Sequence, residues 1–469
     1  MLPSNWAGPA TGPRRFDLVS EGMCLRERYR PLGESPQLDR VFEVALGAGA
    51  TQVYLDRPYV DFDYRSDLAH FYARAFRPPP PDTERLLFAD EEKIIGASVV
   101  RPLPQQVGRT HLPPPKDLKP YVTCTTEMGL HAFGSPWTTT GYPFTSQDGE
   151  YGVCAHAAMW SIARYHHLEF GTERYTTSGI IEAAGLRERP DKTARSAGLY
   201  AQDIVRGFRG IGLPALEYDV EAIPSARETP HTIIHRYLNS GIPVGVLTSV
   251  HMLVLIGYGV ASSGEPFYIV SDDRYGAYER APLNDAANED GAWKMLVIPQ
   301  PGRMHVNGEA AEARAEEAFE DRIRADTGPS HLFQMWQDGS LQTRTYATPS
   351  SAYIEKLTAR GMSGELRQHH IYAPKGNWLW VTEFQDPKAA EDQLVIAEVA
   401  VDATSLHLDP SPIFANIEGW AYVWGAGERE PSVIDTETSA RFKSAMSDPG
   451  EREASPAPEY APCSGDPVE

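Results

Sequence analysis

Four residues of this chain have the types and the order that acyl chemistry with a thiol nucleophile requires. Cys154 opens an apolar stretch, and Gln147 precedes it by seven residues. His251 stands just before one apolar, strand-like run, and Asp272 follows the next. A thiolate attacks a carbonyl carbon, an imidazole takes and returns the proton, and a carboxylate orients the imidazole. The sequence therefore predicts a cysteine nucleophile with a histidine base.

The surroundings predicted for Cys154 favour its charged form. The residues after it are apolar on nearly all sides, which predicts a buried helix from 154 to about 167. The N-terminus of a helix stabilises an anion, and a nearby imidazolium such as that of His251 adds to this effect. We expect Gln147 to donate its side-chain amide to the oxyanion, together with the backbone N–H of Cys154.

Two adjacent acids compete for the role of orienting His251. Neighbouring residues of a strand point to opposite faces, so we expect only one of Asp272 and Asp273 to meet the imidazole. We favour Asp272 and keep Asp273 as the alternative. The pattern calls for no metal and no organic cofactor.

Composition limits the class of protein. A length of 469 residues predicts two or three domains. The net charge of −21 argues against a nucleic-acid partner, because phosphates are bound by clustered Lys and Arg. The sequence has no apolar run of the roughly 18 residues that cross a membrane, and its first residues do not resemble a signal peptide. Four scattered cysteines suit a reducing compartment, so we expect a cytoplasmic protein.

The secondary-structure pattern around the four residues is α+β. Helices are predicted near 200–208 and 232–238, and strands at 243–248, 252–258, 267–270 and 293–298. Pro-rich stretches and shifts in composition predict the boundaries between domains. The predicted parts are a loose segment at 1–40, a small α+β domain at 41–120, a catalytic domain at 121–302, a connector helix at 303–328, an α+β domain at 329–425 and an acidic disordered tail at 426–469.

Motifs of other enzyme classes do not occur. The chain lacks GxxxxGK[ST], GxGxxG, HExxH and GxSxG, so phosphate-loop, dinucleotide, zincin and serine-hydrolase functions have no motif here. His156, two positions after Cys154 on the predicted helix, points away from the thiol and is a poor candidate for its base.

Three stretches resemble a known family, the papain-like domains of bacteriocin-processing (double-glycine) cysteine peptidases. They are the segment from Gln147 through Cys154 to Trp160, the run from Gly-Ile-Pro-Val at 241–244 through His251 to Gly-Tyr at 257–258, and Ser-Asp-Asp-Arg-Tyr-Gly at 271–276. The resemblance implies Cys154 as nucleophile, His251 as base and acid, Asp272 as orienter and Gln147 as oxyanion donor. It also implies a helical N-terminal part and a C-terminal antiparallel sheet.

The chain departs from that family in two ways. Ala155 and His156 stand where the family usually has Gly-Pro, and the membrane spans and ATPase of its transporter-linked members are absent from this sequence. The resemblance covers about 160 residues, so the mixed α/β flanking regions at both ends are unassigned. They are candidates for binding a protein partner.

Three functions remain open from the sequence. The first is a cysteine peptidase that cleaves peptide or isopeptide bonds of a peptide or protein substrate. The second is a papain-fold acyltransferase, transglutaminase or deamidase with the same triad, because all of these use the same Cys-His-Asp geometry. The third is a peptide-binding scaffold that has lost catalysis.

Overall fold

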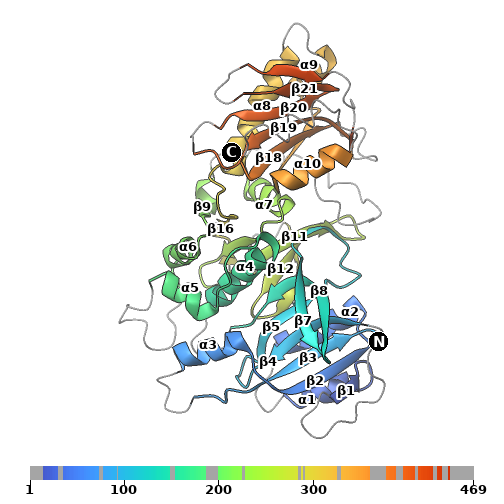
Figure 1. Ribbon diagram of the computed structural model, residues 1–469, viewed down its shortest axis with the longest axis vertical. Helices are drawn as coiled ribbons and strands as arrows, with labels where there is room; N and C mark the ends of the chain where they lie inside the picture. The colour runs from blue at the N-terminus through green and yellow to red at the C-terminus, as the bar shows by residue number, and fades with distance from the viewer. Residues whose placement is uncertain are drawn as a thin grey trace, which may run out of the picture. The chain divides into compact units, whose positions relative to one another are not determined.

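The structure is a computed structural model of the chain, which contains both helices and strands, the strands in antiparallel sheets (Figure 1). It describes residues 14–29, 35–72, 78–91, 93–147, 154–185, 199–223, 228–283, 287–288, 291–324, 329–359, 376–386, 394–406, 410–425, 430–435 and 442–443. The chain forms two compact units, Met1–Gly259 with Phe267–Gly302 and Val260–Pro266 with Arg303–Glu469. No described helix is both long enough and apolar enough to cross a membrane.

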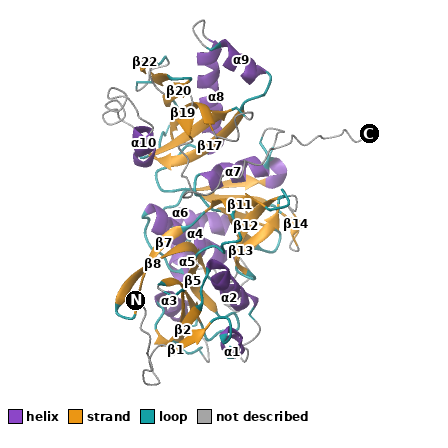
Figure 2. Cartoon of the chain, turned by 90° about the vertical axis from the view of Figure 1, so that its right-hand side faces the viewer, coloured by secondary structure: helices purple, strands orange, loops and turns teal. Residues whose placement is uncertain are grey.

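The first unit begins with a seven-stranded antiparallel sheet (Figure 2). Its strands in spatial order are β1 (Arg14–Asp17), β2 (Gln52–Tyr59), β3 (Thr83–Ala89), β4 (Ile94–Val100), β5 (Val107–Leu112), β8 (Ser135–Phe144) and β7 (Thr126–Ala132). Its helices are α1 (Gly22–Glu27), α2 (Pro36–Ala48) and α3 (Phe62–Phe71). The sheet therefore takes in the hairpin of β7 and β8, which lies beyond residue 120, and elements before residue 41.

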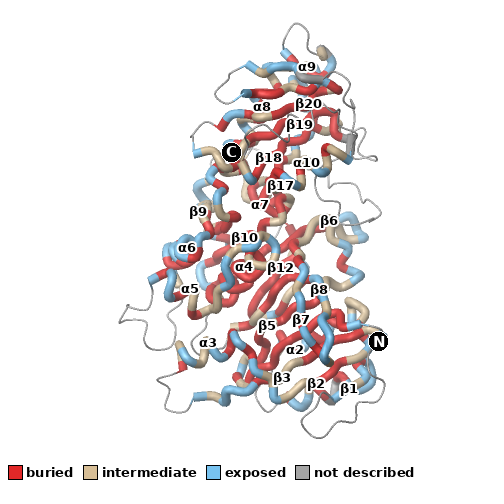
Figure 3. Tube along the Cα trace, viewed as in Figure 1, coloured by how far each residue is buried: buried red, intermediate tan, exposed pale blue. Residues whose placement is uncertain are grey.

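The second sheet of this unit carries the candidate site. Its strands in order are β13 (Gly276–Pro282), β12 (Pro266–Asp272), β11 (Met252–Val260), β10 (Val244–Leu247), β16 (Met295–Pro299) and β9 (Ala215–Asp219), and β6 (Pro120–Thr123) pairs with β11. The pairings are antiparallel, and β10, β11 and β12 are buried along almost their whole length (Figure 3). This burial explains why these strands are nearly continuous apolar runs in the sequence.

Four helices accompany the second sheet. They are α4 (Cys154–Phe170), α5 (Thr177–Ala183), α6 (Ala201–Gly210) and α7 (Pro230–Asn239), with a 3₁₀ turn at Val220–Ala222 and a short hairpin of β14 (Ala287–Asn288) and β15 (Gly291–Ala292). Helix α4 begins at Cys154 as predicted and continues three residues beyond 167. Met159, Trp160 and Ile162 on this helix are almost fully buried, as expected from an apolar pattern without a polar face.

The described residues of the second unit form one antiparallel sheet and three helices. The strands in order are β17 (Gln342–Pro349), β18 (Trp378–Gln385), β19 (Leu394–Asp402), β20 (Pro412–Ile417), β21 (Trp420–Val423) and β22 (Ser432–Asp435), and β23 (Phe442–Lys443) pairs with β19; the helices are α8 (Gly308–Arg324), α9 (Ser330–Gln337) and α10 (Ser350–Ala359). The sequence predicts α8 as a connector, but its apolar face packs on this sheet, where Phe319 stacks on Phe384 at 3.9 Å between ring centroids. The short strands β22 and β23 lie in the part predicted to be an acidic tail, and β22 contains the β-branched pair Val433 and Ile434.

A buried ionic cluster joins α3 of the first sheet to α4. Asp63 on α3 lies 3.1 Å from the guanidinium of Arg164 on α4, 3.3 Å from that of Arg174 and 3.9 Å from that of Arg109. The side chains of Asp63 and Arg164 are 9% and 5% exposed. A buried charge whose partner is removed is strongly destabilising, so this cluster helps to fix α4 against the first sheet.

We predict that Asp63→Ala lowers the free energy of unfolding by about 3 kcal/mol, because it leaves the buried guanidinium of Arg164 without its anion. Urea unfolding would measure this. Asp82→Ala is the matched control, because it breaks an exposed ion pair between Asp82 and Arg65, a residue of α3 like Asp63. This substitution should lower the free energy of unfolding by less than about 1 kcal/mol. Equal effects of the two substitutions would contradict a structural role for the cluster.

Candidate active site

The structure brings Cys154, His251 and Asp272 together. Cys154 is the first residue of α4 and carries a free, partly exposed thiol. His251 directly precedes β11, and Asp272 is the last residue of β12, which lies beside β11 in the sheet. Two neighbouring strands and one buried helix therefore position the three side chains.

His251 is linked on both sides. Its Nε2 lies 3.0 Å from Oδ1 of Asp272, and an imidazole N–H donates to a carboxylate across such a distance. The imidazole also forms a hydrogen bond with the thiol of Cys154. Because Nε2 faces Asp272, Nδ1 is the ring nitrogen left for the thiol. The three side chains form a continuous chain of hydrogen bonds.

The main chain at His251 is fixed by Thr248. The Thr248 hydroxyl accepts a hydrogen bond from the backbone N–H of His251 at 3.0 Å, and the Thr248 N–H donates to the His251 carbonyl at 2.9 Å. These bonds close a tight turn between β10 and β11, so the imidazole leaves the sheet in a defined direction. Sequence reasoning missed Thr248, although a threonine three residues before the histidine is the kind of residue that caps such a turn.

Asp273 lies closer to His251 than strand alternation predicts. Its Oδ1 is 3.7 Å from Nε2 of His251, so both acids approach the imidazole. Both acids lie near the imidazole because β12 ends at Asp272 and its pairing with β13 shifts register between Val270 and Asp272. The alternating pattern of a strand does not continue into a turn. Only Asp272 is within hydrogen-bonding distance of the imidazole.

The acids and the thiol together favour the charged form of His251. Burial opposes the positive charge, but the hydrogen bonds with Asp272 and Cys154 and the charges of Asp272 and Asp273 outweigh it and raise the pKa of His251 to about 10. These contacts therefore favour the imidazolium over the neutral ring. An imidazolium next to a thiol stabilises the thiolate.

The two acids differ in how they are stabilised. Burial would raise the pKa of Asp272, but the hydrogen bond and charge of His251 and the contacts of Arg274 lower it below its usual value. The backbone N–H of Arg274 donates to Oδ1 of Asp272 at 2.9 Å, and its guanidinium lies 3.5 Å from Oδ2. Burial raises the pKa of Asp273 to about 7, and neither of its carboxylate oxygens has a hydrogen-bond partner among the described residues. Sequence reasoning missed Arg274, which directly follows the acidic pair.

Gln147 lies beyond the end of β8, and its backbone carbonyl accepts a hydrogen bond from the buried Arg101 at 3.1 Å. Residues 148–153, which connect it to Cys154, lie outside the described residues. No contact between the Gln147 side chain and Cys154 is found in the described part. The oxyanion role of Gln147 stays a prediction.

His251, Asp272 and Asp273 are also the described residues that offer metal-ligand atoms within 4.8 Å of one another. Imidazole nitrogen and carboxylate oxygen are a donor set that zinc accepts. A cation between them would replace the proton that Nε2 shares with Asp272 and would break the hydrogen bond that orients the imidazole. Metal binding and the Cys–His–Asp arrangement therefore exclude each other at these atoms.

Comparison with known proteins gives limited similarity. No family model matches the sequence, and no curated protein matches it. Two similar solved structures are UfSP from C. elegans and the N-terminal peptidase C39 like domain of the toxin secretion ATP-binding protein from Vibrio parahaemolyticus. The first is 18% identical with a TM-score of 0.23 over 39% of this chain and 35% of that one, so the match spans about a third of its length. The second is 16% identical with a TM-score of 0.21 over 32% of this chain and 98% of that domain. These TM-scores are too low to assign a shared fold.

We predict that Asp272→Asn lowers the pKa of His251, because it removes the hydrogen-bonded anion that favours the imidazolium. Histidine-selective NMR titration would measure the change, with the resonance assigned by its loss in His251→Ala. The rate of Cys154 alkylation at pH 6 should fall about 10- to 100-fold, the value of a charge-assisted hydrogen bond. Asp273→Asn is the matched control and should have the smaller effect on both quantities. A larger effect of Asp273→Asn would make Asp273 the orienting acid.

Proposed function

We propose that this chain is a thiol hydrolase, a cysteine peptidase that cleaves peptide or isopeptide bonds with Cys154 as nucleophile, His251 as base and acid, and Asp272 as orienter. The observation that carries the proposal is the hydrogen-bond chain from the Cys154 thiol through His251 to Asp272. A thiol at the start of a buried helix, next to a histidine before a strand, is also the arrangement of a papain-like domain. That fold class is part of the proposal.

The proposed reaction begins with the proton on the imidazole. In the thiolate–imidazolium pair the proton of the Cys154 thiol is already on Nδ1 of His251, and the thiolate attacks the carbonyl carbon of the substrate amide. The tetrahedral intermediate collapses as His251 gives its proton to the departing amine, which leaves a thioester on Cys154. His251 then takes a proton from water, the resulting hydroxide attacks the thioester, and the acid is released as the thiol is restored.

The charges in the site favour these reaction steps. The raised pKa of His251 keeps the imidazolium available to protonate the leaving amine, and the lowered pKa of Asp272 keeps that carboxylate charged beside it. The N-terminus of α4 stabilises negative charge at Cys154. The negative oxygen of the intermediate would accept hydrogen bonds from the backbone N–H of Cys154 and the side-chain amide of Gln147. Each such donor typically lowers the activation barrier by about 3 kcal/mol.

The partly exposed thiol of Cys154 can reach the carbonyl of an amide bond, and the proposed substrate is a peptide or protein. A cytoplasmic location and a protein partner bound by the flanking regions are expectations from the sequence. A peptide pool digested with the wild-type protein would give the cleavage preference once thiol activation is established.

We predict that limiting iodoacetamide labels Cys154 rapidly and selectively well below pH 8. A thiolate–imidazolium pair reacts under conditions where an ordinary thiol, with a pKa of about 8.5, is protonated. Intact-mass measurement from pH 4 to 9 would show a single adduct that Cys154→Ala abolishes. His251→Ala should slow the reaction and move it to higher pH. Cys124 is an internal control, because burial raises the pKa of its thiol and should keep it unlabelled.

An ordinary reactivity of the Cys154 thiol would contradict the proposed function. If Cys154 reacts with the pH profile of an ordinary thiol in both wild type and His251→Ala, the imidazole does not activate the thiol. The chain would then be a binding scaffold on a peptidase-like site.

A further inference from the structure

The first sheet and its helix α2 touch the turn that carries the two acids. Gln37, at the second position of α2, is 3% exposed, and its Nε2 donates to the backbone carbonyl of Asp273 at 3.1 Å. The amide of Gln37 is oriented by the helix cap, because the hydroxyl of Ser35 donates to its Oε1 at 3.1 Å. The two residues of this contact are 236 positions apart in the sequence.

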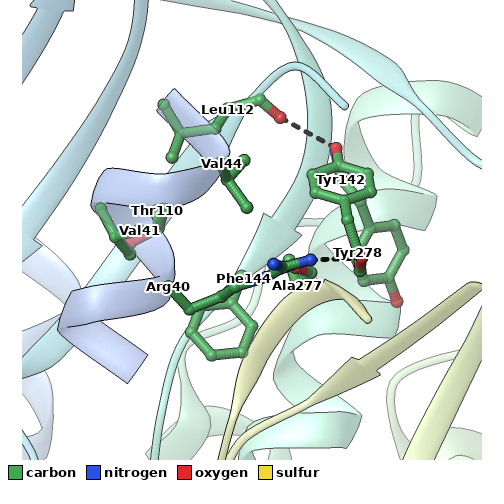
Figure 4. Close-up of a pocket in the computed structure, with 9 residues that line it drawn as sticks. All are labelled: Arg40, Val41, Val44, Thr110, Leu112, Tyr142, Phe144, Ala277 and Tyr278. Atoms are coloured by element: carbon green, nitrogen blue, oxygen red, sulfur yellow. Dashed lines mark hydrogen bonds between the residues drawn. The ribbon is translucent and has the colours of Figure 1, made fainter. Parts of the chain in front are cut away.

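A second anchor lies one helical turn further along α2. Arg40 donates to the backbone carbonyls of Ala277 at 3.3 Å and Tyr278 at 2.6 Å, and its guanidinium pairs with Glu279 at 2.8 Å. Figure 4 shows Arg40 extending from α2 to the main chain at Tyr278. The strand that follows the acidic turn is thus held along three successive residues.

The sequence accommodates this close approach with a glycine. Gly276 has φ of +138°, which side chains rarely adopt, and a Cβ added there would lie 2.4 Å from Cγ of Arg40. The hydroxyl of Tyr278 in turn donates to the carbonyl of Leu112 in β5 and accepts from the N–H of Tyr142 in β8, at 2.8 and 2.7 Å. Strand β13 is therefore fastened to α2 on one side and to the first sheet on the other.

The same framework reaches the segment of Gln147. The buried guanidinium of Arg101, just after β4, donates to the carbonyls of Gln105 and Gln147, both at 3.1 Å. The side chain of Gln105 accepts from Nε2 of Gln37 at 3.5 Å. Gln37 thus contacts both the acidic turn, through Asp273, and the residues that hold the Gln147 segment, through Gln105.

We infer that α2 is a built-in part of the active site and that Gln37 is a positioning residue, which sets the turn bearing Asp272 and Asp273 against His251. The inference rests on the proposed function. Inside the turn, the N–H of Tyr275 donates to the carbonyl of Asp272 at 3.1 Å. Gln37 adds an anchor from outside the turn, at the next carbonyl along the chain. Loss of this anchor lets the acids move relative to the imidazole and weakens the hydrogen bond that favours the imidazolium.

The test compares Gln37→Met with Gln105→Met. The first keeps a side chain of similar length but removes the donor to Asp273, and the second removes the neighbouring amide but keeps that donor. We expect Gln37→Met to slow Cys154 alkylation at pH 6 about fivefold, the value of one buried hydrogen bond, and to move the pH profile of alkylation upward. Gln105→Met should leave the profile unchanged. Thermal melting of each variant separates this effect from unfolding.

The outcomes distinguish the inference from the proposed function. If wild-type Cys154 shows no reactivity at low pH, the proposed function fails, whatever Gln37 does. If wild type is reactive, His251→Ala is not, and folded Gln37→Met keeps the wild-type profile, the inference alone is overturned. If Gln37→Met does not fold, Arg40→Lys takes its place, since it keeps the cation for Glu279 but loses the fork that binds two carbonyls. An unchanged profile in folded Arg40→Lys would then overturn the inference.

Discussion

A buried imidazole can hold a proton only if an anion lies beside it, and the hydrogen bond from His251 to Asp272 meets that requirement. The rest of the candidate site depends on this contact. Without Asp272, burial would favour the neutral ring, which stabilises a thiolate less and has no proton for a leaving amine. The neighbouring strands β11 and β12 supply the contact because His251 directly precedes the first and Asp272 ends the second. Antiparallel neighbours place such ends at one edge of the sheet.

The two sheets of the first unit have different roles in the candidate site. The second sheet and α4 supply the side chains that would react, and the first sheet with α2 holds the main chain around them through Gln37, Arg40 and Arg101. The ionic cluster of Asp63 and Arg164 fixes the helix of the nucleophile to the same framework. A region that the sequence leaves unassigned is thus in direct contact with the acidic turn. This arrangement makes the N-terminal part of the chain a support for the site.

The sequence predicts local features of this molecule well and distant ones poorly. A buried helix starting at Cys154, and strands after His251 and before Asp272, follow from apolar runs of a few residues, and the structure has them. The contact of Gln37 with Asp273 joins residues 236 positions apart and leaves no pattern in either segment. The pairing of β8 with β5, which draws residues beyond 120 into the first sheet, is equally invisible to periodicity. The approach of both acids to His251 depends on where a strand ends, the least reliable part of any prediction from sequence.

The two acids show how one site can bury three titratable groups. Two carboxylates and one imidazolium would leave a net negative charge in a region of low dielectric, which is costly. Asp272 receives the imidazole, a backbone N–H and the nearby guanidinium of Arg274, so its charge is stabilised. The carboxylate of Asp273 has no hydrogen-bond partner in the described part, and burial raises its pKa to about 7. Burial thus opposes the charge of Asp273, while the hydrogen bond of Asp272 fixes the direction of the His251 imidazole.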